Sequence, residues 1–257
     1  MQANFRTAAW PDLSPPSCFP ALLAVVFPKA PCQMSLLPLT KDGAPLNPTD
    51  FLRPDELGEW QSFASGKRRQ EWLGGRLCAY DRARWLTNPT GDTAPFPVRD
   101  WRLANAEDGH PFWQGNIPEF LHGTNISISH GGGYALAVTA RSPVGADVQL
   151  CSTKVERVAE QFAARQEENI LTRLAPEEDR LNRLTLLWSA KESLRKAACL
   201  SGQATGPPAF LAMRLTAGRR EIHGWSLILA WQQTGHEVSV AATLHDGHAF
   251  AFCLLEE

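Results

Sequence analysis

The stretch Trp188–Lys196, WSAKESLRK, lies near the end of a long predicted helix that starts around Pro176. Apolar side chains recur along one face of this helix at helical spacing, at Leu181, Leu184 and Trp188. The same face continues with charged side chains, Lys191, Glu192 and Arg195. A helix that leaves a core and brings a carboxylate beside several cations suits a metal-and-phosphate site. The alternative is a helix whose last turns are solvated and carry an ordinary Glu192–Lys196 pair.

Composition limits the classes of protein that this chain can belong to. The chain has 257 residues, is 44% hydrophobic and carries a net charge of −2, so no global positive field favours nucleic acid or a membrane surface. The six cysteines are scattered, with no CxxC pair and no Cys/His cluster, which predicts neither a zinc site nor a disulfide framework. The apolar run at 21–27 is too short to span a bilayer and lacks a preceding basic segment. We therefore expect a soluble, cytoplasmic protein.

A pattern of one strand, two helices and several strands occurs twice along the chain. The first pass has a strand at 22–27, helices at 55–64 and 67–86, and strands near 98–103, 125–129 and 134–140. The second has a strand at 144–150, helices at 153–162 and 176–199, and strands near 210–216, 225–231, 238–244 and 249–255. The pattern predicts an α+β protein with two similar halves, 21–142 and 143–257, after an irregular lead-in at 1–20. An accidental similarity is the alternative, because the halves share no clear residue-level repeat.

Two strand-like segments carry polar side chains suited to ligands. In 144–150, VGADVQL, the side chains of Asp147 and Gln149 face one way and could supply oxygen ligands to Mg²⁺. The alternative is a half-buried strand with a polar outer face. In 125–134, NISISHGGGY, Ser129 and His130 lead into three glycines that let backbone amides approach a ligand. The alternative there is a surface histidine at a hairpin.

A basic stretch at 67–76, KRRQEWLGGR, begins the second predicted helix. Arg69 and Arg76 share a helix face, and Arg68 and Arg76, about 80° apart, are also able to converge. Clustered arginines without matching acids nearby grip phosphates. A solvated basic helix start and a nucleic-acid patch are the alternatives, and the net acidity of the chain argues against the second.

Taken together in this order, the segments resemble the motifs of the 4′-phosphopantetheinyl transferases, in particular the monomeric two-half, surfactin-synthetase-activating type. The matching patterns are W-x-x-K-E-x-x-x-K at 188–196, G-x-D-x-E at 145–149, S-x-S-H-x-x-x-Y at 127–134 and K-R-R-x-E-x-x-x-x-R at 67–76, with a looser G-K-P-like match at 109–111. The resemblance implies two similar α/β halves related by pseudo-twofold symmetry, with the active site between them.

The resemblance also implies an activity: the 4′-phosphopantetheine arm of coenzyme A passes to a serine of an apo acyl, polyketide or peptidyl carrier protein, with Mg²⁺ as the cofactor. It implies that Asp147 and Glu192 bind the metal, with Gln149 in the place of a second acid on that strand. Glu192 would be the base, with Lys191 and Lys196 as further catalytic groups that stabilise the pyrophosphate. Coenzyme A would be held by six side chains, Arg68, Arg76, His110, Ser129, His130 and Lys196.

Three functions follow as hypotheses. The first is the active transferase, a monomer of fatty-acid, polyketide or nonribosomal-peptide biosynthesis whose client carrier the sequence does not specify. The second is a relative that binds coenzyme A or a carrier protein without chemistry, for which Gln149 is the support, because an amide oxygen contributes less charge to a metal site than a carboxylate. The third is an α+β protein with a basic patch for RNA or another partner.

Overall fold

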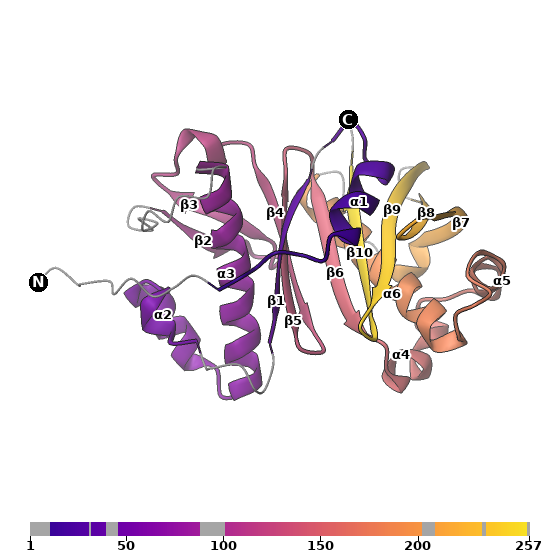
Figure 1. Ribbon diagram of the computed structural model, residues 1–257, viewed down its shortest axis with the longest axis horizontal. Coiled ribbons are helices and arrows are strands. Elements are labelled where there is room, and N and C mark those ends of the chain that lie inside the picture. Colours follow the sequence, from indigo (N-terminus) through magenta and orange to yellow (C-terminus); the bar gives the residue numbers. More distant parts are fainter. Residues whose placement is uncertain are drawn as a thin grey trace, which may run out of the picture.

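The structure is a computed structural model, and it describes residues 11–30, 32–39, 46–87, 101–201, 209–232 and 235–255. It contains two larger antiparallel sheets, each covered by one long helix (Figure 1). The mixed α+β class predicted from the sequence is confirmed. None of the described helices combines the length and the apolar character needed to cross a bilayer.

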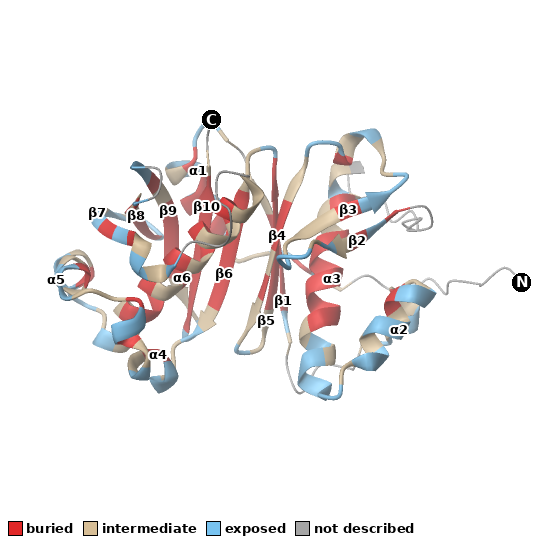
Figure 2. Ribbon diagram, turned by 180° about the vertical axis from the view of Figure 1, so that it is seen from behind, coloured by how far each residue is buried: buried red, intermediate tan, exposed pale blue. Residues whose placement is uncertain are grey.

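The N-terminal part is built on a three-stranded sheet of order β1-β5-β4. Its strands are β1 (Gln33–Pro38), β5 (Tyr134–Ala140) and β4 (Asn125–Gly131), and α3 (Gly66–Thr87) packs across all three. The small helix α2 (Pro54–Ser62) and the hairpin of β2 (Trp101–Asn105) and β3 (Pro111–Gly115) complete this part, with short 3₁₀ turns η1 (Pro48–Asp50) and η2 (Glu119–Leu121). The buried side of α3 and the inner face of the sheet form one apolar core (Figure 2).

The C-terminal part is built on a five-stranded sheet of order β6-β10-β9-β8-β7. The strands are β6 (Val144–Leu150), β10 (His248–Leu254), β9 (His236–His245), β8 (Gly224–Trp231) and β7 (Met213–Glu221). Helix α6 (Arg180–Leu200) lies against β6, β10 and β9, and its start is capped by Asp179, whose carboxylate accepts from Asn182 N. Between β6 and α6 lie α4 (Thr153–Arg157), η3 (Ala159–Gln161) and α5 (Arg165–Leu174), and η4 (Phe210–Ala212) precedes β7.

The two sheets meet at β4 and β6 through side chains instead of a backbone ladder. Ser127 Oγ accepts from Ala146 N at 3.0 Å, and Ser129 Oγ accepts from Val148 N at 3.2 Å. Gly131 lies so close to β6 that a Cβ there would stand 2.6 Å from the carbonyl oxygen of Val148. The serines on one face of β4 therefore complete the hydrogen bonding of β6 and hold the two sheets together.

Several predicted elements differ in the structure. The strand expected at 22–27 is part of a helix, α1 (Cys18–Val26), which also begins within the predicted irregular lead-in. A short apolar run does not distinguish strand from helix by itself, and Phe19, Leu22 and Leu23 have the i, i+3, i+4 spacing of a buried helical face. Strands β1 and β3 and helix α5 were not predicted, and the helix expected at 153–162 ends at Arg157.

The remaining predicted elements correspond to observed ones. The predicted helices at 55–64 and 67–86 match α2 and α3, and the predicted strands at 125–129, 134–140 and 144–150 match β4, β5 and β6. The helix expected from 176 begins at Arg180, and the strand expected from 210 begins at Met213. Part of the strand expected near 98–103 lies outside the described residues. The division into halves at 142/143 and their similarity stay predictions.

Candidate functional site

Asp147 lies on β6 and forms the centre of the candidate site. Its side chain is buried, and its Oδ1 accepts from Ser129 Oγ at 2.9 Å and from Lys196 Nζ at 3.0 Å. Its Oδ2 is buried without a hydrogen-bond partner. A buried carboxylate oxygen in this state is ready to accept a cation or a donor.

The close approach of α6 to β6 depends on Gly145. A Cβ at this position would collide with the carbonyl oxygen of Ser193 and lie 2.7 Å from Ala197 N, so only glycine lets the helix rest on the strand backbone. The approach lets Lys196 Nζ donate to the carbonyl of Ala146 at 2.8 Å as well as to Asp147. The two segments that the sequence singled out, 144–150 and 188–196, are therefore in direct contact.

Glu192 is the second carboxylate of the site. Its side chain is mostly buried and lies 3.4 Å from Arg195 Nε. Burial raises the pKa of the Glu192 carboxyl, Asp147 adds to that effect, and Lys196 and Arg195 oppose it. A carboxyl whose pKa is raised by burial is suited to take up a proton at the working pH of an enzyme.

His130 and Arg68 form a second group at the end of β4 and the start of α3. Arg68 Nη1 lies 2.8 Å from His130 Nε2, and Glu71 Oε2 lies 3.6 Å from His130 Nδ1. Burial and the charge of Arg68 lower the pKa of His130, an effect that Glu71 opposes and to which Lys196 contributes. His130 directly follows Ser129, which bonds Asp147, so the histidine group adjoins the Asp147 group along β4.

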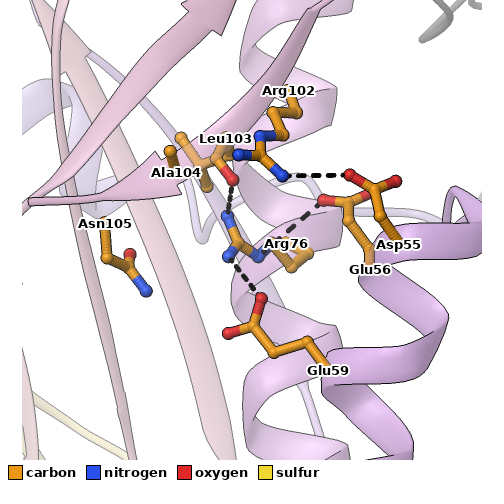
Figure 3. Close-up of a pocket in the computed structure, with 8 residues that line it drawn as sticks. All are labelled: Asp55, Glu56, Glu59, Arg76, Arg102, Leu103, Ala104 and Asn105. Carbon is orange, nitrogen blue, oxygen red and sulfur yellow. Dashed lines mark hydrogen bonds and ion pairs between the residues drawn. The ribbon is translucent and has the colours of Figure 1, made fainter.

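Arg76 does not join Arg68 in a shared phosphate grip. It is buried, donates to the carbonyl of Leu103 at 2.6 Å and lies 3.8 Å from Glu59 and 4.0 Å from Glu56, beside a polar pocket (Figure 3). The expectation that the basic stretch has no matching acids nearby is wrong, because α2 supplies two carboxylates that the sequence pattern of 67–76 could not reveal. In this arrangement Arg76 holds α2, α3 and β2 together.

Lys191 lies apart from the two carboxylates of the site. Its side chain is fully buried, and its Nζ donates to the carbonyl of Phe162 at 2.6 Å and lies 2.8 Å from Glu167 Oε1. Burial lowers the pKa of Lys191, whereas Glu167 raises it. The expectation that Lys191 shares one charged face with Glu192 and Arg195 is wrong: Lys191 points into the core of the C-terminal part, about 100° round the helix from Glu192.

Two further candidates make contacts of their own. His110 Nδ1 is 2.5 Å from Asp108 Oδ1 in the β2–β3 turn. Gln149 is partly exposed, and its amide nitrogen donates to the carbonyl of Leu150 at 3.3 Å.

A comparison with known protein families concerns the C-terminal part. A family model described as "4′-phosphopantetheinyl transferase superfamily" matches residues 143–253. Residues 143–253 belong to the 4′-phosphopantetheinyl transferase superfamily. This transferase segment contains β6 and α6, and with them Asp147, Glu192 and Lys196.

A solved structure is also similar to part of the chain. It is the holo-[acyl-carrier-protein] synthase of Helicobacter pylori in complex with coenzyme A, with 15% identity and a TM-score of 0.31 over 44% of this chain and 99% of that chain. A likeness with so low a TM-score carries no argument, so the assignment of the transferase segment rests on the family model. A search of curated proteins gave no match.

The transferase segment offers two carboxylates for a divalent cation. The unpartnered Oδ2 of Asp147 and the nearby Glu192 fit Mg²⁺, which commonly takes one or two carboxylates and completes its shell with water and substrate phosphates. Within the described ranges, no group of three or more His, Cys, Asp or Glu side chains is arranged to hold a metal ion. The two carboxylates therefore suit a cation whose remaining ligands come from substrate oxygens and water.

Sequence reasoning missed three residues that contact the predicted site residues or their strand. Ser127 was not singled out, although it bonds β6 as Ser129 does. Glu71 was quoted only as part of the basic stretch, and its spacing of four from Lys67 indicated a pair that the structure contains at 3.6 Å. Glu167 gave no signal, because its partner Lys191 lies 24 residues away.

Proposed function

We propose that the protein is a 4′-phosphopantetheinyl transferase of the holo-[acyl-carrier-protein] synthase type. In this reaction the serine hydroxyl of an apo carrier protein attacks the phosphorus of coenzyme A that bears pantetheine. The new serine O–P bond replaces the P–O bond to the adenosine side, and adenosine 3′,5′-bisphosphate leaves. The observation that carries the proposal is the ion pair of Asp147 with Lys196 within the superfamily segment, with Glu192 one helical turn before Lys196 on α6.

The side chains have separate roles in this proposal. Glu192 takes the proton of the attacking serine, a role that the burial-raised pKa of its carboxyl supports. Lys196 stabilises negative charge on the pyrophosphate and on the leaving group. Arg68 and His130 bind the nucleotide end of coenzyme A, because they lie together and can donate to phosphate oxygens. Asp147 and Glu192, with Gln149 beside them, would hold Mg²⁺, which when bound supplies charge neutralisation at the pyrophosphate.

The proposal extends to assembly and location. Asp147 and Glu192 come from one sheet-and-helix part of the chain and Ser129 and His130 from the other, so a single chain supplies the whole group and we propose a monomer. All six cysteines are free thiols, which supports a reducing, cytoplasmic location. The partner is an apo acyl, polyketide or peptidyl carrier protein.

The test is intact-protein mass spectrometry of an apo carrier protein incubated with this protein, coenzyme A and Mg²⁺. We expect a gain of about 340 Da on the carrier, the mass of the phosphopantetheine arm on serine. The gain should disappear when the carrier serine is replaced by alanine, and it should fall at least about a hundredfold in rate in Glu192→Gln.

The matched control is Glu177→Gln, the same chemical change at a half-exposed glutamate that pairs with Arg220 away from the site. This variant should transfer at the wild-type rate. Full activity of Glu192→Gln would remove Glu192 as the base.

A non-catalytic relative is the second candidate function, and Gln149 is the observation that favours it. Gln149 is the residue at which the resemblance leads us to expect a second acid, so the metal site has less charge than a three-carboxylate site. Binding of coenzyme A with no mass gain on acyl, polyketide or peptidyl carriers would favour this candidate over the transferase.

A further inference from the structure

His248 occupies a buried position where two hairpin turns meet. It begins β10, and its side chain lies between the β9–β10 turn of the C-terminal sheet and the β4–β5 turn of the N-terminal sheet. Its Nδ1 lies 2.6 Å from the carbonyl oxygen of Asp246, and its Nε2 lies 3.0 Å from the carbonyl oxygen of Gly132. Both turns lie at the same end of the strands (Figure 1). The imidazole therefore bridges the two sheets.

Both neighbours of the ring nitrogens are acceptors. A neutral imidazole has one N–H donor and one acceptor nitrogen, so it satisfies one of these carbonyls and repels the other. The doubly protonated ring donates to both. Asp246 supplies a negative charge in the same hairpin turn, and it adopts a positive φ of 48°.

Tyr134 adds a second link across the same junction. Its hydroxyl donates to Asp246 Oδ2 at 2.9 Å, and its ring lies edge-on to that of His248 with centroids 4.9 Å apart. The other groups opposite His248 are His245, its register partner on β9, and the apolar Leu150, its register partner on β6. Gly132 has φ +60°, and a Cβ there would collide with His248 Nε2, so the turn is shaped around the imidazole.

We propose that His248 is a positioning residue that clamps the glycine turn of β4–β5 to the C-terminal sheet and thereby holds His130 in place for the nucleotide end of coenzyme A. His130 is two residues before Gly132, so fixing the turn limits the movement of its imidazole and of Arg68 bonded to it. The inference rests on the proposed function for its ligand, whereas the clamp is a property of the chain alone.

The experiment compares wild type with His248→Phe, which keeps a ring and removes both donors, and Tyr134→Phe, which removes only the hydroxyl. His223→Phe makes the same change at an exposed histidine of the β7–β8 turn and serves as the control. Hydrogen exchange of residues 130–135 reports the clamp without any ligand. Calorimetric titration with coenzyme A reports its effect on binding, and the thermal midpoint of each variant is recorded so that all are compared while folded.

We expect exchange at 130–135 to be about tenfold faster and coenzyme A binding about tenfold weaker in His248→Phe, with smaller changes of the same direction in Tyr134→Phe and none in the control. Wild-type exchange at 130–135 in His248→Phe would overturn the clamp. If His248→Phe failed to fold, wild-type exchange in Tyr134→Phe would overturn it instead.

The two proposals fail in different ways. Absence of coenzyme A binding by wild type would remove the proposed function, and the hydrogen-exchange results would then decide the clamp alone. If both variants bind coenzyme A as tightly as wild type does, the positioning role is refuted and the transferase proposal stands.

Discussion

Replacing Lys191 by methionine tests whether this lysine stabilises the fold or takes part in the chemistry. The Lys191 ammonium and the Glu167 carboxylate are both buried, at 0% and 3% side-chain exposure, with 2.8 Å between Nζ and Oε1. Methionine fills nearly the same volume and removes the charge. Glu167 then keeps only its hydrogen bonds from Leu215 N and Ala164 N, at 2.8 Å each.

Breaking one partner of a buried ion pair costs about 3–5 kcal/mol, because an uncompensated charge stays buried. At about 2–4 °C per kcal/mol for a chain of this length, we expect Lys191→Met to lower the thermal midpoint by roughly 6–20 °C. Urea unfolding followed by tryptophan fluorescence measures the free energy of unfolding directly. The control is Lys154→Met at an exposed site on α4, which should change the free energy of unfolding by no more than about 0.5 kcal/mol.

Two results would refute this reasoning. A loss of free energy of unfolding below about 1 kcal/mol would mean that the pair is not desolvated as the structure describes. A loss of transfer activity of about a hundredfold or more, measured well below the thermal midpoint, would instead restore the catalytic role expected from the sequence. Adding Glu167→Leu to Lys191→Met should regain only part of the lost stability, since it leaves the two backbone amides without an acceptor.

Three further predictions concern the site and its frame. Burial raises the pKa of Glu192, and a base acts only when it is deprotonated. The midpoint of the acid limb in the pH profile of kcat/KM should therefore lie above the ordinary glutamate pKa of about 4.3. A midpoint at or below that value would contradict the assignment of Glu192 as the base. Gly145→Ala should lower the free energy of unfolding, measured in urea, by about 3 kcal/mol or more and abolish transfer, because the new Cβ collides with α6. The control Gly58→Ala, with open space around it in α2, should leave the free energy of unfolding unchanged or raise it. Ser129→Ala should lower the free energy of unfolding by about 1–3 kcal/mol, because it leaves a β6 amide without its acceptor. The control Ser62→Ala, at the exposed end of α2, should change the free energy of unfolding little. Equal effects of the two substitutions would contradict the role of β4 in joining the sheets.

The sequence predicted the elements that carry the site because their patterns are local. The alternation of 144–150 and the helical spacing of 181–188 place Asp147 on a strand and Glu192 on a helix without any knowledge of tertiary contacts. Glu192 and Lys196, four apart, were predicted as neighbours on one helix; both lie on α6, and Lys196 pairs with Asp147 at 3.0 Å. The metal-binding roles that the resemblance implies for Asp147, Glu192 and Gln149 stay predictions.

The features that the sequence did not predict depend on contacts between distant segments. The orientation of Lys191 is set by a glutamate on another helix, and that of Arg76 by two glutamates of α2 and the backbone of β2. A single sequence without contact information leaves such partners unspecified, so a buried cation and a solvated one look alike. The failure at α1 has the same origin, since packing against the C-terminal sheet decides that 18–26 is helical.

The packing of α1 has a consequence for the order of events during synthesis. Phe19 lies 4.8 Å, between ring centroids, from Phe250 and 6.1 Å from Phe252, residues that follow it by more than 230 positions. On the ribosome the apolar face of this helix stays uncovered by β10 until that strand, more than 230 residues later, has been made, which exposes the face to association with other chains. Because contacts so distant in sequence form slowly, docking of α1 against β10 is a natural late step of folding.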